Sequence, residues 1–197
     1  MTDVNPSTAA ARSTSGIAEA GAAVGRDSPE ARAVTMIELL FFAYRDFTAE
    51  PDAILAELGF WRAHHRVLHF VNRNQGLRVA DLLGILKITK QSLARVLKQL
   101  VDEGFIVQAA GKSDRRERRL LVTEKGRALA NRLLELQARR LSDALQAAGP
   151  DAAEAAEAFL LGVISEGDRE AVRRLVGAGS SGARQDRPAG TAKRGAQ

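Results

Sequence analysis

The chain of 197 residues contains no cysteine. Disulfide bonds, thiolate metal sites and a cysteine nucleophile are therefore excluded, and the composition fits a reducing compartment. No apolar run approaches the roughly 20 residues that span a bilayer, and the N-terminus lacks the continuous apolar core of a secretory signal. We therefore expect a soluble, cytoplasmic protein with no membrane partner.

Motifs for catalysis are also lacking. The sequence has no glycine-rich phosphate loop, no nucleophile elbow and no convincing carboxylate pair for acid–base chemistry. His65 and His69 have the i, i+4 spacing that can hold zinc on a helix, but no nearby cysteine, aspartate or glutamate completes a set. His69 falls on an apolar stripe, where a hydrogen-bonded core histidine is commoner. We expect no enzyme activity, no cofactor and no metal, although the histidines could line a ligand cavity or respond to pH.

Positive charge is concentrated in the middle of the chain. Residues 59–126 carry 14 lysines and arginines against 6 aspartates and glutamates, a net charge of +8. Residues 1–58 have a net charge of −5 and residues 127–197 a net charge of +2. Clustered positive charge attracts phosphate backbones whatever their sequence, so a nucleic-acid partner is favoured.

The two ends are predicted to be disordered tails. Residues 1–29 and 177–197 are rich in small and polar side chains and have too few large apolar ones to offset the entropy of ordering. Between them, residues 30–176 show the apolar periodicity of helices. The helices expected there cover about residues 29–47, 79–86, 89–102, 124–148 and 151–176, the last with a break near Gly167 and Asp168. A further helix, which contains Trp61 and His65, is expected to end near residue 74. The expected strands cover residues 105–110 and 118–123.

The predicted helix from Thr89 to Asp102 has two distinct faces. Thr89 is a good N-cap residue, and an inner stripe of leucines and one valine follows at i, i+3, i+4 and i+7. The other face carries residues that can hydrogen-bond base edges or phosphates, Arg suiting guanine and Gln suiting adenine. These residues are Thr89, Lys90, Gln91, Ser92, Ala94, Arg95 and Lys98. The alternative is an ordinary amphipathic helix with a solvated polar face.

A basic hairpin follows this helix. Its tip contains Lys112, Ser113, Asp114, Arg115 and Arg116, and arginines on such a loop can enter a narrow minor groove. Asp114 would be repelled by phosphate unless it is paired, and we expect it to hydrogen-bond Arg116. The alternative is a merely soluble turn. Arg118 and Arg119 alternate faces of the strand, so at most one of them follows the tip towards DNA.

A family resemblance rests on several of these motifs. The stretches Ile88–Leu93, Glu103–Ile106, Ser113–Arg116 and Leu121–Gly126 resemble the MarR family of bacterial transcriptional regulators. The resemblance implies a mainly α fold with a small β-hairpin wing, in which interlocking N- and C-terminal helices form a homodimer that binds pseudo-palindromic operators. It matches Thr89, Lys90, Gln91, Ser92 and Arg95 to the helix that reads DNA and Asp114 and Arg116 to a salt-bridged pair in the wing. The stretch Trp61–Leu68 is similar to the PetP-type branch, and the missing cysteine excludes thiol oxidation as the switch.

The organisation expected is a winged-helix core over residues 59–126 between dimerisation helices over 30–50 and 124–176. These helices carry more apolar surface than a small winged helix can bury alone, which favours pairing of two chains; the alternative is that they close the core of one chain. The resemblance also implies a small-molecule effector that binds between the dimerisation helices and the DNA-binding lobe. Residues that could border such a pocket are Phe41, Tyr44, Arg45, Trp61 and His65. Two other functions stay open, a protein-interaction module and an architectural DNA binder without sequence preference.

Overall fold

The computed structural model describes residues 28–111 and 117–182. It divides into two compact units, Met1–Asp46 and Phe47–Gln197. The described part of the first unit belongs to α1 (Pro29–Glu57), which continues into the second unit. Most of the two predicted tails lies outside the described residues.

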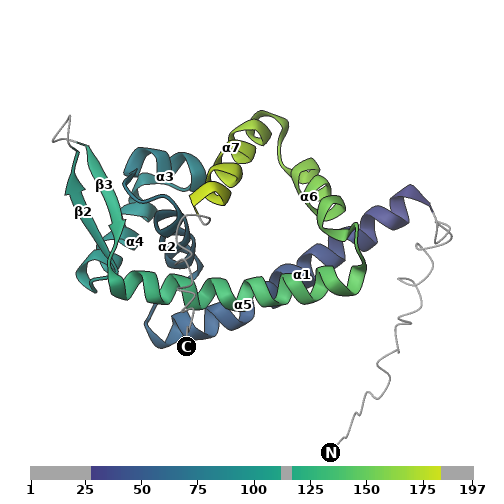
Figure 1. Cartoon of the computed structure of the whole chain (residues 1–197), viewed down its shortest axis with the longest axis horizontal. Coiled ribbons are helices and arrows are strands. Elements are labelled where there is room, and N and C mark those ends of the chain that lie inside the picture. The colour runs from purple at the N-terminus through teal and green to yellow at the C-terminus, as the bar shows by residue number, and fades with distance from the viewer. Residues whose placement is uncertain (1–27, 112–116, 183–197) are drawn as a thin grey trace, which may run out of the picture. The chain divides into compact units, whose positions relative to one another are not determined.

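The second unit is mainly helical and contains one small antiparallel sheet, which confirms the predicted fold class (Figure 1). Two of its helices, α4 and α5, begin at a threonine that caps the first turn. Thr89 and Thr123 act as N-caps, because their side-chain oxygens accept hydrogen bonds from the backbone N–H groups of Ser92 and Gly126. After α1 its elements are α2 (Arg62–Arg73), β1 (Leu77–Arg78), α3 (Val79–Leu86), α4 (Lys90–Asp102), β2 (Ile106–Ala110), β3 (Arg118–Val122), α5 (Glu124–Ala148), α6 (Ala152–Val163) and α7 (Glu166–Gly182).

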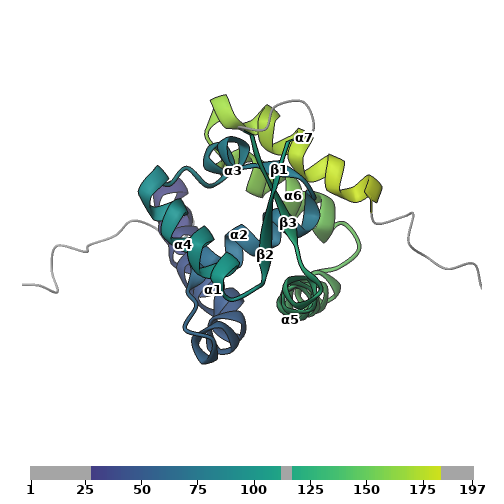
Figure 2. The same ribbon diagram turned by 90° about the vertical axis from the view of Figure 1, so that its left-hand side faces the viewer.

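The hydrophobic core of this unit surrounds α2, which packs against both α4 and α5 (Figure 2). Burial of large apolar side chains supplies most of the free energy that holds these helices together. The predicted inner stripe of α4 is buried in full. The largest core side chains that solvent does not reach are Phe60, Phe105, Leu55, Leu68, Leu82, Leu93, Leu100, Ile106, Leu120 and Leu133.

The sheet has the strand order β1-β3-β2, and both pairings are antiparallel. The hairpin of β2 and β3 confirms the predicted wing strands, and Ile106 lies opposite Val122 in its register. The two-residue strand β1 was not predicted, because it is too short to show an alternating pattern. It is placed by Gly76, whose φ of +83° suits glycine and whose N–H donates to the Leu120 carbonyl at 2.9 Å.

The first helix is longer than predicted. Its expected end near residue 47–50 is wrong, since α1 continues through Pro51 to Glu57. A proline inside a helix removes one backbone hydrogen bond, which normally favours a break. Here the added turns bury Thr48, Pro51 and Leu55 on one side, and this burial offsets the missing bond.

The break in the C-terminal helical region also differs from the prediction. It lies at Ile164 and Ser165 rather than near Gly167 and Asp168. The Arg169 guanidinium donates to the carbonyl oxygens of Ile164 and Gly162, both at 2.8 Å, and so satisfies backbone groups at the end of α6. The helix α7 then runs to Gly182, six residues beyond the predicted helix end at residue 176.

Several helices leave apolar side chains uncovered in the single chain. In the first unit, Ile37, Phe41 and Tyr44 of α1 are each at least half exposed. In the second unit, α6 buries none of its residues, and Phe159, Leu160 and Val163 lie open. None of the described helices combines the length and the apolar character that crossing a bilayer requires.

Candidate nucleic-acid interface

The helix α4 is held in a fixed orientation by its ends and its buried stripe. At its N-terminus, Thr89 accepts the Ser92 N–H at 3.1 Å and donates its own hydroxyl proton to the Ser92 Oγ at 2.9 Å. Before it, Lys87 closes α3 in the left-handed conformation (φ +50°), and its N–H donates to the Leu83 carbonyl. The short turn between α3 and α4 therefore has a defined geometry, as a helix-turn-helix requires.

The predicted polar face of α4 is exposed. The structure places Lys90, Gln91, Ala94 and Arg95 in solvent on one side of the helix, with Thr89 and Ser92 at its start. Lys90 and Arg95 make no ion pair with any described residue, so their charges are available to a ligand. A packed helix that presents free cations and amides along one face suits the contacts that base edges and phosphates make.

Lys98 differs from the other predicted contact residues. Its ammonium group forms an ion pair with Asp102 one turn later, at 2.5 Å. The charge of Lys98 is therefore compensated in the free protein, and a DNA phosphate would have to compete with the carboxylate for it.

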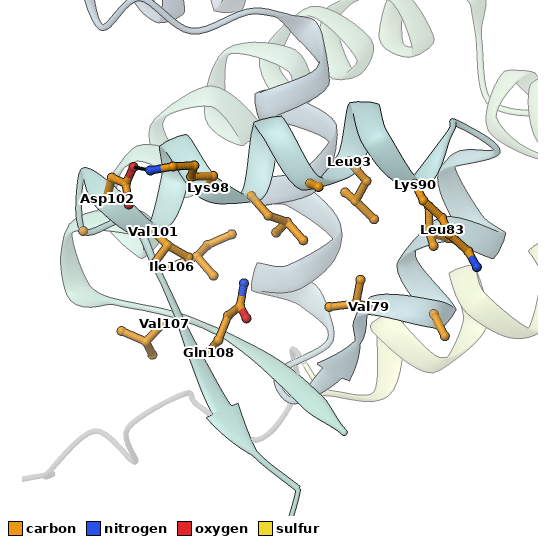
Figure 3. Close-up of a pocket in the computed structure, with 14 residues that line it drawn as sticks. Val79, Leu83, Lys90, Leu93, Lys98, Val101, Asp102, Ile106, Val107 and Gln108 are labelled. Carbon is orange, nitrogen blue, oxygen red and sulfur yellow. Dashed lines mark hydrogen bonds and ion pairs between the residues drawn. The ribbon is translucent and has the colours of Figure 1, made fainter. Parts of the chain in front are cut away.

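An open groove that the sequence did not reveal runs beside α4 (Figure 3). It has a volume of about 860 Å³ and lies between α3, α4 and β2. Val79, Leu83 and Val107 contribute to its apolar wall, whereas Lys90 and Lys98 line it from the polar side of α4. Its residues come from three separate segments, so no local pattern could have shown it.

The base of the wing is joined to the start of α3 by ion pairs. Arg78 donates to both carboxylate oxygens of Asp81 at 2.7 Å and to Glu117 at 3.4 Å. The second oxygen of Glu117 accepts from Arg119 at 3.3 Å. Arg78 and Arg119 are cross-strand neighbours, so Glu117 offsets a repulsion between like charges. The Arg78 guanidinium also holds the pKa of the Asp81 carboxyl below its usual range.

Lys112, Ser113, Asp114, Arg115 and Arg116 lie outside the described residues, and the expected Asp114–Arg116 bond stays a prediction. On the strand that follows, Arg118 is exposed and Arg119 is half-buried, in keeping with alternate faces. The Nε of Arg119 is buried and has no hydrogen-bond partner among the described residues.

The histidine that the structure buries is not the one expected. His64 is 4% exposed, whereas His65 and His69 are partly buried, so the expectation that His69 is the core histidine is wrong. The buried face of α2 is formed by His64, Val67, Leu68 and Val71. Within the part of the chain that is described, no three histidines, cysteines or acids gather as a metal site would need.

The residues of the predicted effector pocket are distributed over both compact units. Phe41, Tyr44 and Arg45 belong to the first unit, where the Arg45 guanidinium pairs with Asp46 at 2.7 Å. Trp61 and His65 belong to the second, where Trp61 is 71% exposed at the start of α2. The pocket stays a prediction.

Comparison with known proteins adds to this geometry. Residues 58–117 match the family model described as the MarR family. The HTH-type transcriptional regulator PetP of Rhodobacter capsulatus is 52% identical over 116 residues, which cover 59% of this chain and 70% of the relative. The HTH-type transcriptional repressor Rv2887 of Mycobacterium tuberculosis is 32% identical over 83 residues, which cover 42% of this chain and 60% of the relative.

Solved structures share the fold. A putative MarR family regulator from Listeria monocytogenes, complexed with a 26mer DNA, matches with a TM-score of 0.56 and 18% identity, covering 78% of this chain and 97% of that chain. NadR in complex with 4-hydroxyphenylacetate matches with a TM-score of 0.54 and 21% identity, covering 61% and 86%. At these identities the likeness concerns the arrangement of helices and strands.

Proposed function

This chain belongs to the MarR family of winged helix-turn-helix transcriptional regulators, and from that premise we propose that it binds a pseudo-palindromic DNA operator as a homodimer. The family is one of DNA-binding regulators and not of enzymes.

The observation that carries the proposal is the exposed face of α4. Gln91 and Arg95 lie one turn apart on a helix whose opposite side is buried. Both side chains can therefore reach base edges while packing holds the helix backbone in place. Arg can bond both acceptors of guanine, and Gln can bond the donor and acceptor of adenine. Thr89, Ser92 and Lys90 lie at the N-terminal end, where they suit phosphate contacts that set the register. Lys98 contributes once it leaves Asp102.

The wing supplies the second contact in this proposal. Arg115 and Arg116, with Lys112 and Ser113, would approach the minor groove next to the site of α4, and Asp114 would orient Arg116. The support is the basic composition of the hairpin and its described base, which joins the start of α3 through Arg78 and Glu117. A winged helix uses both elements because the two grooves follow each other along the duplex.

Dimerisation is supported by the uncovered apolar side chains. Phe41 is 70% exposed on α1, and Leu160 is 55% exposed on α6. Monomeric proteins rarely leave several large apolar side chains exposed next to one another, because covering them removes apolar surface from water. A two-fold dimer would present two copies of α4 to half-sites about one helical turn apart. A small-molecule effector that contacts Phe41, Tyr44, Arg45, Trp61 and His65 could then control release of DNA.

The test is a set of gel-shift titrations on duplexes that the full chain selects from a random library. Arg95→Ala is expected to lower operator affinity about 5- to 150-fold and to relax the base preference at one position. Arg116→Ala is expected to weaken binding to all sequences and to flatten the salt dependence. Arg139→Ala is the matched control, since Arg139 is an exposed arginine on α5.

The outcomes separate the three candidate functions. Unchanged affinity in both test variants would contradict the assignment of these residues. Equal binding of selected and random duplexes would favour an architectural DNA binder. No binding to any duplex at low salt would favour a protein-interaction module.

A further inference from the structure

One polar residue of α4, Gln99, follows Arg95 by one turn and has a fixed set of partners. Gln99 is half-buried, and its side-chain oxygen lies 2.9 Å from Nε2 of His64 on α2. Its amide nitrogen donates to the Gly59 carbonyl at 3.3 Å and to the Glu103 carboxylate at 3.0 Å. No motif in the sequence singles out Gln99, because its main partner lies 35 residues earlier.

The direction of the His64–Gln99 bond follows from the other ring nitrogen. The backbone N–H of Trp61 donates to Nδ1 of His64 at 3.0 Å, so Nδ1 carries no proton. A neutral imidazole then has its proton on Nε2, which donates to the Gln99 oxygen. Every polar atom of the two side chains is therefore used, and a network satisfied in this way specifies one arrangement of its members.

The ring of His64 is also fixed by packing. It stacks on Phe60 with ring centroids 4.7 Å apart and an angle of 12° between the planes. Phe60 meets Phe105 edge-on at 5.1 Å, and Phe105 directly precedes β2. The burial of the ring lowers the pKa of His64, which keeps the imidazole neutral and able to accept the Trp61 N–H.

Resting on the proposed function of α4, we propose that the His64–Gln99 hydrogen bond positions the base-reading helix, so that His64 and Gln99 are positioning residues for operator recognition. The leucine stripe of α4 holds the helix by apolar contacts, which are not directional. A hydrogen bond with fixed donor and acceptor adds an angular constraint. Arg95 lies one turn before Gln99. The hydrogen bond therefore constrains the rotation of α4 that decides where the Arg95 side chain meets a base.

The two functions of His64 can be separated by two substitutions. In His64→Asn the side-chain oxygen can replace Nδ1 and accept the Trp61 N–H, but the side chain is too short to reach Gln99. In His64→Gln the amide nitrogen can replace Nε2 and donate to Gln99, whereas the bond to Trp61 is lost. The proposal requires that the asparagine variant loses operator preference and that the glutamine variant keeps it.

The measurement compares dissociation constants of the full chain for a selected operator duplex and for a scrambled duplex of equal length. We expect His64→Asn to lower the ratio of the two affinities about tenfold, with binding to the scrambled duplex nearly unchanged. We expect His64→Gln to retain the ratio within about twofold. Gln99→Met, which removes both amide functions at similar size, is expected to behave like His64→Asn and serves if the asparagine variant fails to fold.

The outcomes that overturn the inference are distinct from those that overturn the proposed function. If the unmodified chain prefers the operator and His64→Asn and Gln99→Met retain the full ratio, the positioning role is wrong. A ratio lost equally in His64→Asn and His64→Gln, together with lower thermal stability in both, would show a general structural role instead. If the unmodified chain binds no duplex at all, the proposed function fails and this inference fails with it.

Discussion

Gly126 of α5 lies against the backbone of Phe105, so closely that a Cβ atom on the glycine would come within 2.0 Å of the Phe105 carbonyl oxygen. The same carbonyl oxygen accepts the Thr123 N–H at 3.1 Å. The first turn of α5 is therefore docked on the segment that leads from α4 into the wing. The absence of a side chain at Gly126 is what permits this approach.

Gly126→Ala is expected to lower the free energy of unfolding by about 1–3 kcal/mol, because the methyl group must displace backbone atoms that cannot move alone. Urea denaturation at constant protein concentration measures the change. Gly84→Ala is the matched control: Gly84 is also helical, has open space around it, and should be neutral or up to about 1 kcal/mol more stable as alanine. Equal stability of the Gly126→Ala variant and the unmodified chain would contradict the close contact.

The ion pairs at the base of the wing predict a change in DNA binding with a definite sign. Glu117→Gln removes the carboxylate that compensates Arg78 and Arg119. Affinity for random duplex at low salt should rise, and the plot of log affinity against log salt should steepen by up to about one unit. Glu154→Gln on α6 removes the same charge at an exposed position and serves as the control. A lower affinity in Glu117→Gln would show that the carboxylate holds the wing in its binding position.

Stability should fall in mild acid because the histidines are buried. Burial lowers the pKa values of His64, His65 and His69 in the folded chain, whereas in the unfolded chain they titrate near their ordinary value of about 6.5. Below that pH the unfolded state binds more protons, so the free energy of unfolding decreases as the pH falls, by at most about 1.4 kcal/mol per pH unit for each histidine. Above it this contribution is fully present. The charged group that acts on His64 from the neighbouring helix is Glu103.

Denaturation curves between pH 5 and 8 test this dependence. His64→Gln should show a shallower decrease in acid than the unmodified chain, because one of the three titrations is removed. If both chains lost stability with the same slope, His64 would not be a buried neutral group.

The exposed apolar side chains of α1 predict a change in association state. Phe41→Ser should shift the chain from dimer towards monomer at micromolar concentration, since Phe41 is 70% exposed and gains its burial from a partner in the proposed dimer. Sedimentation velocity measures the shift. Arg32→Ser, at an exposed charged position on the opposite side of the same helix, should leave the dimer intact. An unmodified chain that sediments as a monomer would contradict the proposed dimer directly.

Local signals in the sequence predicted much of the winged-helix fold. The bounds of α3 were predicted correctly, and Thr89 was identified as the N-cap of α4. Each of these depends on a few consecutive residues, such as an N-cap side chain followed by apolar residues at helical spacing. The exposed face of α4 was predicted for the same reason, since burial of its leucine stripe leaves the polar residues outside.

Features that depend on distant contacts were missed. The end of α1 was predicted near residue 47, but the buried face of the helix continues through Pro51 to Leu55. The choice between His64 and His69 as the core residue depends on which side of α2 meets Gln99 and Phe60. The pairing of Arg78 with Glu117 joins residues 39 apart, and the groove beside α4 combines three elements. None of these leaves a pattern along the chain.

The groove between α3, α4 and β2 has a thermodynamic consequence. Val79, Leu83 and Val107 line it next to the cations of α4, so a duplex that receives this helix also covers hydrocarbon and releases the water over it. Loss of hydrated apolar surface lowers the heat capacity of the complex relative to its separate parts. The enthalpy of operator association should therefore become more favourable with each degree of warming, as titration calorimetry at several temperatures can record.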